Sequence, residues 1–111
     1  MPPLQKQGEE DSFVLVMSES LREGLSGVIG KSGMEAVFYN FKLKDRLMNP
    51  KLTHETLLPA FKERGTEILE KAVMKEVFRR INSQYIFDGE FSYEEMFHRA
   101  RRAFVSNQIR E

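Results

Sequence analysis

One stretch of the chain has the residue types of a phosphate-binding loop. Gly30, Lys31 and Ser32 match the second half of the Walker A motif, in which backbone amides, a lysine and a hydroxyl hold nucleotide phosphates and magnesium. The motif also requires a glycine where this chain has Leu25. It follows a buried strand in nucleotide-binding proteins, whereas the residues before Gly30 have apolar positions at helical spacing. We therefore predict that the stretch joins two helices and binds no nucleotide.

Glu95 and His98 have the spacing of a metal-binding element. A glutamate and a histidine three residues apart lie on one side of a helix, as in di-iron carboxylate bundles. Such a site needs a second copy of the element, which a homodimer could supply, and two further glutamates. Helix capping by Ser92 and Glu95 and an ion pair between Glu94 and His98 are simpler explanations. A metal-binding helical protein is therefore only our third hypothesis.

The sequence has no recognisable combination of a nucleophile, a base and a group that orients the base. It contains two histidines and no cysteine, which excludes disulfides, thiol catalysis and cysteine-based zinc sites. We predict a protein that is not an enzyme and that uses no cofactor.

A row of basic residues, Lys71, Lys75 and Arg79, recurs every four positions on a predicted helix. Such a row could follow the phosphate backbone of a nucleic acid. It could equally be a solvated helix face, because Glu67 and Glu76 are placed to form ion pairs with basic residues four positions later. A nucleic-acid-binding transcriptional regulator is therefore the alternative function.

Arg99, Arg101 and Arg102 form a second basic group, and arginine makes bidentate contacts with carboxylates or phosphates. Neighbouring acidic residues would repel a phosphate backbone. Positive and negative side chains balance at 17 each, so no excess charge attracts nucleic acid. We therefore assign these arginines to a protein partner.

The length of 111 residues predicts one domain, over residues 12–111, after a flexible, polar lead over residues 1–11. No apolar run approaches the roughly 20 residues of a transmembrane helix, and the first residues lack the apolar core of a signal peptide. These features predict a soluble, cytoplasmic protein that does not bind membranes.

The apolar spacing predicts an all-α fold, a compact bundle of about five helices. Gly30 and Gly65 are expected to end helices, and the Asn49-Pro50 pair is expected to form a turn. Pro59 favours a helix start after Thr56, because proline is tolerated in the first turn. The predicted helices span residues 12–29, 33–45, 57–64 and 66–81, with a last one beginning at the Ser92 cap. An Asp-Gly turn within residues 85–91 predicts one short β-hairpin before the last helix.

Each predicted helix has apolar residues that are expected to face the core. They are Val14, Met17, Leu21, Leu25 and Val28; Met34, Val37, Phe38 and Phe41; Leu57, Leu58 and Phe61; Leu69, Val73, Val77 and Ile81; and Tyr93, Phe97, Ala100 and Phe104. Leu15 and Val16 fall outside the first of these stripes. Either a second layer of the fold covers them or a partner does, and the excess of apolar surface predicts a homodimer.

Several segments resemble those of a small archaeal family, the Nitrosopumilus output domain of the fifth class. They are residues 29–33, residues 35–39, Asn49-Pro50, the helix with Glu67, Leu69 and Lys71, and residues 91–94. The resemblance spans about residues 15–105 and is carried by helix boundaries. Members of that family occur alone or attached to receiver domains, which implies a signalling output of uncharacterised mechanism. It provides no catalytic residues.

Together these observations predict a non-catalytic protein-interaction module in cytoplasmic regulation or signalling output. The residues predicted to contact a partner are Leu15, Val16, Arg99, Arg101 and Arg102.

Overall fold

The computed structural model describes residues 2–86 and 89–109, and the side chains of residues 12–86 and 89–107. It has three α-helices, α1 (Pro2–Glu35), α2 (Pro50–Arg80) and α3 (Tyr93–Ile109). A π-helical turn, η1 (Ala36–Asn40), and a 3₁₀ turn, η2 (Leu43–Asp45), connect α1 to α2. No strand occurs in the described residues, so the predicted all-α class is confirmed, whereas the predicted five helices and β-hairpin are wrong.

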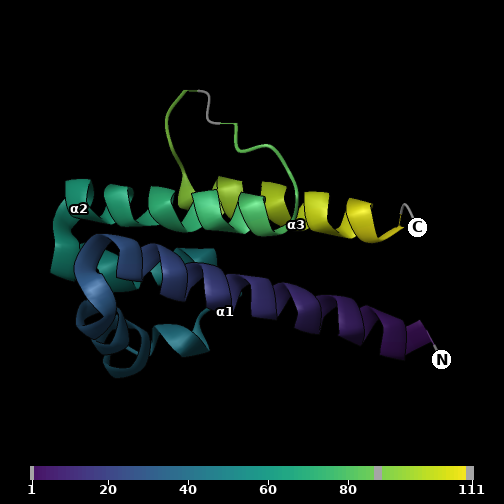
Figure 1. Cartoon of the computed structure of the whole chain (residues 1–111), viewed down its shortest axis with the longest axis horizontal. Coiled ribbons are helices and arrows are strands. Elements are labelled where there is room, and N and C mark those ends of the chain that lie inside the picture. Colours follow the sequence, from purple (N-terminus) through teal and green to yellow (C-terminus); the bar gives the residue numbers. More distant parts are fainter. Residues whose placement is uncertain (1, 87–88, 110–111) are drawn as a thin grey trace.

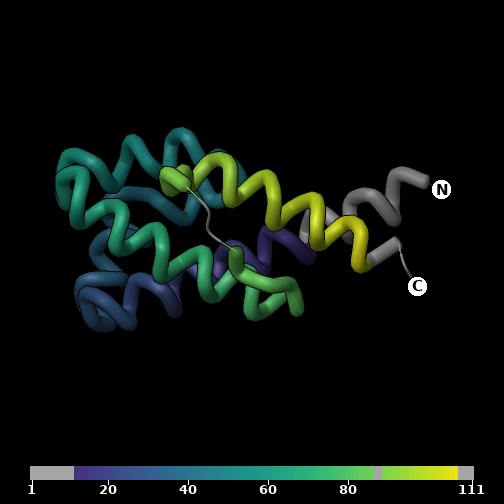
Figure 2. Tube along the Cα trace, turned by 90° about the horizontal axis from the view of Figure 1, so that it is seen from above, coloured from purple at the N-terminus to yellow at the C-terminus, as the bar shows by residue number. Residues whose placement is uncertain are grey.

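The helices form an elongated body of 43 × 31 × 21 Å, in which α2 packs against both α1 and α3. Figure 1 shows that α2 reverses direction within its length, so that its two halves run side by side; the orthogonal view in Figure 2 agrees. In Figure 1 the second half of α2 runs along the long axis of the molecule, with α3 behind it and α1 below it. None of the helices in the described part of the chain is long and apolar enough to cross a membrane.

Gly30 breaks the regular geometry of α1. Its backbone angles are φ 83° and ψ 168°, which glycine adopts readily and other residues rarely adopt. The helix end predicted at Gly30 corresponds to this break, beyond which α1 continues to Glu35. The predicted helix over residues 33–45 is wrong, because Lys42 takes a left-handed conformation, φ 62° and ψ 30°, that separates η1 from η2. Val28 and Phe41, expected in the core, are 45% and 41% exposed.

The structure begins the first helix at Pro2 instead of Ser12. The side chains of residues 1–11 lie outside the described part, so the division into a lead over residues 1–11 and a domain over residues 12–111 stays a prediction.

α2 begins at Pro50, seven residues before the predicted start of the third helix. The side chain of Asn49 caps this start by accepting a hydrogen bond from the Leu52 amide at 3.1 Å, and Pro50 occupies the first turn, where its missing N–H costs nothing. Pro59 lies inside the helix. The expected start after Thr56 is wrong because the Asn49 cap and the burial of Thr53 and Leu57 favour the longer helix.

α2 turns at Lys62 and not at Gly65, where a helix end was predicted. Lys62 has φ 61° and ψ −179°, the one residue of α2 with non-helical backbone angles. Gly65 lies beyond this corner, inside the second half of the helix.

The end of α2 is a Schellman motif. The amide of Asn82, a residue with φ 58°, donates to the carbonyl of Arg79 at 3.2 Å, and the amide of Ser83 donates to the carbonyl of Phe78 at 2.9 Å. This motif directs the chain away from the helix axis. Residues 85, 86 and 89–91 of the predicted hairpin contain no strand, and Phe87 and Asp88 lie outside the described residues. Tyr85 instead packs on Phe78, with ring centroids 5.8 Å apart.

The core is apolar and continuous across the three helices. The predicted stripes on the second half of α2 and on α3 are confirmed, since all eight residues are buried. α1 and α3 meet through Phe13, whose ring centroid lies 5.6 Å from that of Phe97 and 5.3 Å from that of Phe104. Phe13 was not among the predicted core residues.

Candidate functional site

The outer face of α3 carries the clearest candidate binding surface. His98, Arg101, Arg102, Val105 and Ser106 surround a shallow groove of about 410 Å³. Their spacing places them on one side of the helix, and the buried residues Tyr93, Phe97, Ala100 and Phe104 occupy the other. The groove therefore presents two guanidinium groups, one imidazole and a small apolar floor, and no carboxylate is among its lining residues.

Arg99 does not join this groove, although the sequence grouped it with Arg101 and Arg102. Its Nη1 donates a hydrogen bond to the carbonyl of Ile86 at 3.2 Å, and its Nη2 lies 4.0 Å from Glu95 Oε1. Arg99 therefore holds the segment before α3 against the helix. His98 and Val105 share a helix face with Arg101 and Arg102 because of their spacing. This spacing is visible in the sequence and could have predicted the groove.

The structure separates Leu15 from Val16. Leu15 is 59% exposed, and Val16 is partly buried and packs against the core. Of these two residues, only Leu15 is exposed enough to contact a partner. Val16 is covered in large part by the core of the fold.

The basic row on α2 is partly neutralised by acidic residues of the same helix. Lys71 Nζ lies 2.8 Å from Glu67 Oε2, and Arg79 Nη2 lies 2.7 Å from Glu76 Oε1. Lys71 also lies over the ring of Phe91, 5.8 Å from its centroid. The two ion pairs reduce the positive charge that the row offers to a phosphate backbone.

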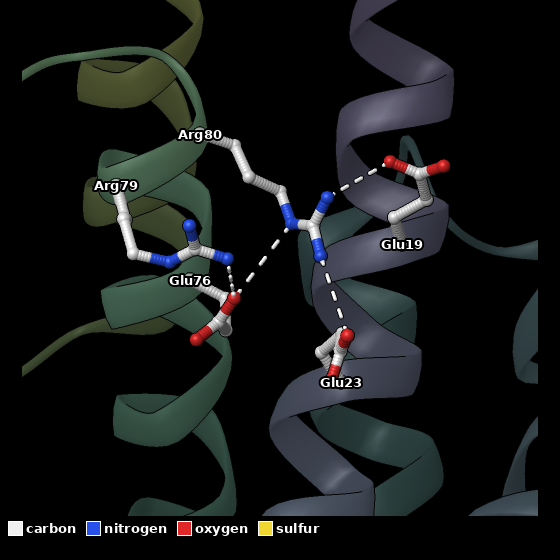
Figure 3. Close-up of polar contacts among 5 residues, drawn as sticks. All are labelled: Glu19, Glu23, Glu76, Arg79 and Arg80. Atoms are coloured by element: carbon white, nitrogen blue, oxygen red, sulfur yellow. Dashed lines mark hydrogen bonds and ion pairs between the residues drawn. The ribbon is translucent and has the colours of Figure 1, made fainter.

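Arg80 links α2 to α1 through two acidic residues (Figure 3). Its Nη1 donates to Glu19 Oε1 at 2.9 Å, its Nη2 lies 3.7 Å from Glu23 Oε1, and its Nε lies 3.7 Å from Glu76 Oε1. The predicted pair of Glu76 and Arg80 is therefore present, whereas the contacts of Arg80 with Glu19 and Glu23 were not predicted. This cluster joins α1 to α2.

Lys31 lies beside these same acids. It lines a cavity of about 510 Å³ together with Glu19 and Glu23. Arg22 and Arg80 line the same cavity, so its charge is mixed. Gly30, the residue before Lys31, breaks a helix, whereas a phosphate-binding loop follows a strand. The geometry thus disfavours a phosphate-binding loop at Gly30, Lys31 and Ser32.

His54 and Glu70 form a polar pair that the sequence did not suggest. His54 Nδ1 lies 2.7 Å from Glu70 Oε2, and the side chain of Glu70 is 3% exposed. Burial raises the pKa of Glu70, while the hydrogen bond and charge of His54 lower it in part and the nearby Glu67 raises it. The pair faces a cavity of about 500 Å³ between the two halves of α2 and residues 89–91.

Tyr93, at the start of α3, is also buried. Burial raises the pKa of its hydroxyl, and the negative charge of Glu70 raises that pKa further. Both effects favour the neutral form of the Tyr93 hydroxyl.

Glu95 and His98 do not converge with further metal ligands. The amide of Glu95 donates to Ser92 Oγ at 3.2 Å, which is the predicted helix cap, and His98 Nε2 lies 4.0 Å from Glu94 Oε2. In the described part of the chain, no group of three or more histidine, aspartate or glutamate side chains is arranged to hold a metal ion.

Compared with protein-family models, curated proteins and solved structures, the chain matches none of them. The resemblance to the Nitrosopumilus output domain stays a prediction, and the surfaces described above are the basis for any proposed function.

Proposed function

We propose that this protein is a non-catalytic interaction module whose α3 face binds an acidic segment of a protein partner. The groove formed by His98, Arg101, Arg102, Val105 and Ser106 is the observation that supports this proposal. Arginine suits such a role because its planar guanidinium group binds a carboxylate through two parallel hydrogen bonds.

The size of the groove favours a peptide segment over a nucleic acid. Residues 98–106 span about 12 Å along α3, which corresponds to a few side chains of a bound segment. Val105 adds a small apolar contact next to the charges, as the polar rim and apolar centre of protein interfaces require.

The other basic surface supports the same choice. Lys71 and Arg79, which would extend a nucleic-acid site along α2, are ion-paired with Glu67 and Glu76. The chain carries no net charge. A module of this kind could act in cytoplasmic regulation or as a signalling output, as the sequence predicts.

A binding titration with a defined probe tests the proposal. A fluorescein-labelled peptide of about a dozen residues, rich in glutamate with interspersed leucine, is titrated with the protein, and fluorescence anisotropy is recorded at about 0.15 M salt. We expect saturable binding to the native protein and at least tenfold weaker binding to the Arg101→Ala, Arg102→Ala double variant, since each charged contact is worth about 1 kcal/mol or more.

The matched control removes two exposed basic side chains elsewhere. Arg64→Ala combined with Lys75→Ala changes the net charge by the same amount and should leave peptide binding unchanged. Equal weakening by both double variants would mean that the peptide responds only to overall charge and would contradict the proposal. Tighter binding of duplex DNA than of the peptide, lost with Arg101 and Arg102, would replace it with the nucleic-acid function.

A further inference from the structure

The corner of α2 consists of a single residue. Lys62 separates the helical residues 50–61 from the helical residues 63–80, and no loop is inserted between them. At φ 61° and ψ −179° it has a backbone conformation that only glycine adopts readily. Its Nζ donates to the carbonyl of Pro59 at 3.3 Å, so the side chain caps the first half of the helix that its own backbone ends. The corner is therefore strained, and contacts elsewhere must maintain it.

Contacts between the two halves of α2 provide this restraint. His54 and Glu70 are 16 residues apart and joined at 2.7 Å. In a straight helix the same residues would be about 24 Å apart. Leu57 on the first half and Leu69 on the second are both fully buried, at 0% and 1% exposure. The folded-back form thus gains a hydrogen bond to the buried carboxylate of Glu70 and the burial of two leucines, which offset the strain at Lys62.

A second copy of the chain can provide every one of these contacts. If Lys62 becomes helical, α2 straightens, and the residues after the corner lose their packing against the residues before it. Two such open chains can restore that packing by exchange. The two chains have the same sequence, so contacts exchanged between them have the same geometry as the contacts within one chain. The exchange also relieves the backbone strain at two Lys62 corners. The cost is the lost freedom of the associating chains.

We propose that this protein forms a domain-swapped homodimer, in which α2 is straight at Lys62 and residues 63–109 of each copy pack on residues 2–61 of the other. Glu70 then pairs with His54 of the other copy. Each of the two cavities at His54 and Glu70 in the dimer is therefore lined by both chains. Arg80 likewise reaches Glu19 and Glu23 of the other copy. This self-association is independent of the α3 groove and differs from the dimer expected at Leu15 and Val16.

Two substitutions at Lys62 favour different forms of the protein, the folded-back monomer and the domain-swapped dimer. Lys62→Gly relieves the strain of the corner and weakens a straight helix, whereas Lys62→Ala favours the straight helix and cannot relax in the corner. Both remove the same contact to Pro59. Analytical ultracentrifugation over a wide concentration range measures the dissociation constant of each dimer. We expect the dissociation constant of the Lys62→Ala dimer to be roughly 30-fold or more lower than that of the Lys62→Gly dimer, because alanine favours the straight helix over glycine at both copies of residue 62.

Cross-linking tests whether that dimer is exchanged. The chain has no cysteine, so Glu19→Cys and Arg80→Cys together introduce two thiols at side chains that meet across α1 and α2. In the Lys62→Ala background, a short bismaleimide linker should produce mainly covalently linked dimers on a denaturing gel. In the Lys62→Gly background it should produce mainly monomers linked within one chain.

Each outcome decides the proposal. If the dimers are cross-linked only within single chains, the copies associate without exchanging segments, and the proposal is overturned. Equal dimerisation of Lys62→Ala and Lys62→Gly would overturn it too. If circular dichroism shows that Lys62→Ala does not fold, the native chain is compared with Lys62→Gly instead. A native chain that dimerises no more than Lys62→Gly at the highest concentration would also overturn the proposal.

Discussion

His54 Nδ1 lies 2.7 Å from the buried Oε2 of Glu70, although the two residues belong to one helix and are separated by 16 positions. This contact exists because α2 folds back at Lys62. It places a carboxylate where water cannot solvate it well, with one histidine as its hydrogen-bonding partner. The stability of the fold should therefore depend on the protonation of Glu70.

The first prediction concerns the pH dependence of stability. Burial, the largest cause, raises the folded-state pKa of Glu70 above its ordinary value of 4.5, so the folded protein holds this proton more tightly than the unfolded chain. The contribution of Glu70 to stability is thus fully present below pH 4.5 and is lost as the pH rises through the folded pKa. Glu70→Gln should remove this decline, and urea unfolding between pH 4 and pH 8 measures it.

The control for this prediction is Glu55→Gln, which changes an exposed acid on the same helix that is not among the groups shifting the pKa of Glu70. It should leave the slope between pH 4.5 and pH 7 nearly unchanged. His54→Ala should steepen the decline, because it removes the hydrogen bond and charge that lower the pKa of Glu70. If Glu70→Gln and the native protein lose stability in parallel, the buried carboxylate of Glu70 does not control this pH range.

The second prediction uses two glycines of α1. A methyl group on Gly24 would lie 2.8 Å from Cα of Val73, so α1 and α2 would have to move apart. The same change at Gly27 meets nothing within 4 Å. Gly24→Ala should therefore destabilise the protein by about 1–3 kcal/mol through overpacking, whereas Gly27→Ala should stabilise it by roughly 0.5–1 kcal/mol through helix propensity. Chemical unfolding measures both, and effects of the same sign would contradict this packing of α1 on α2.

The third prediction tests the contact between α1 and α3. Phe13 is 1% exposed and packs on Phe97 and Phe104, whereas Leu15, two residues later, is 59% exposed. Phe13→Ala should cost about 3–5 kcal/mol in the free energy of unfolding, because it leaves a cavity between the helices. Leu15→Ala should change that free energy by less than about 0.5 kcal/mol. Comparable losses for the two variants would mean that α1 does not present Phe13 to α3; if Phe13→Ala is unfolded, Phe13→Leu should lie between them.

Helical periodicity predicted the interior of the fold well where one face alone is buried. Leu69, Val73 and Val77 on the second half of α2 and Ile81 directly after it recur every four residues, and all are buried. The Ser92 cap was likewise predictable, because a serine three residues before a glutamate is the pattern of a capping box at the start of a helix.

The helix boundaries near Pro59 and Gly65 were not predictable by the same rules. Local preferences placed a start after Thr56 and an end at Gly65, but the packing of Leu57 and the His54–Glu70 pair favour a longer helix with its corner at Lys62. Lysine has no preference for positive φ, so no residue type marks that corner. Tertiary contacts determined it, and these are invisible to a pattern of neighbouring residues.

The candidate site was predictable in part for a similar reason. Arg101 and Arg102 lie together with His98 because they share one face of α3, as their spacing implies. Arg99 was misplaced because its partner, the carbonyl of Ile86, belongs to an irregular segment. The pairing of Arg80 with Glu19, 61 residues earlier in the chain, also had no local signal.

A nuclear magnetic resonance titration tests the proposed function most directly. The ¹⁵N-labelled protein is titrated with the acidic peptide, and backbone amide shifts are followed by residue. We predict that the largest shift changes fall within residues 98–106 of α3, that they saturate, and that they vanish in the Arg101→Ala, Arg102→Ala variant. Changes centred on Lys75 and Arg79, or the absence of saturable changes on α3, would contradict the account.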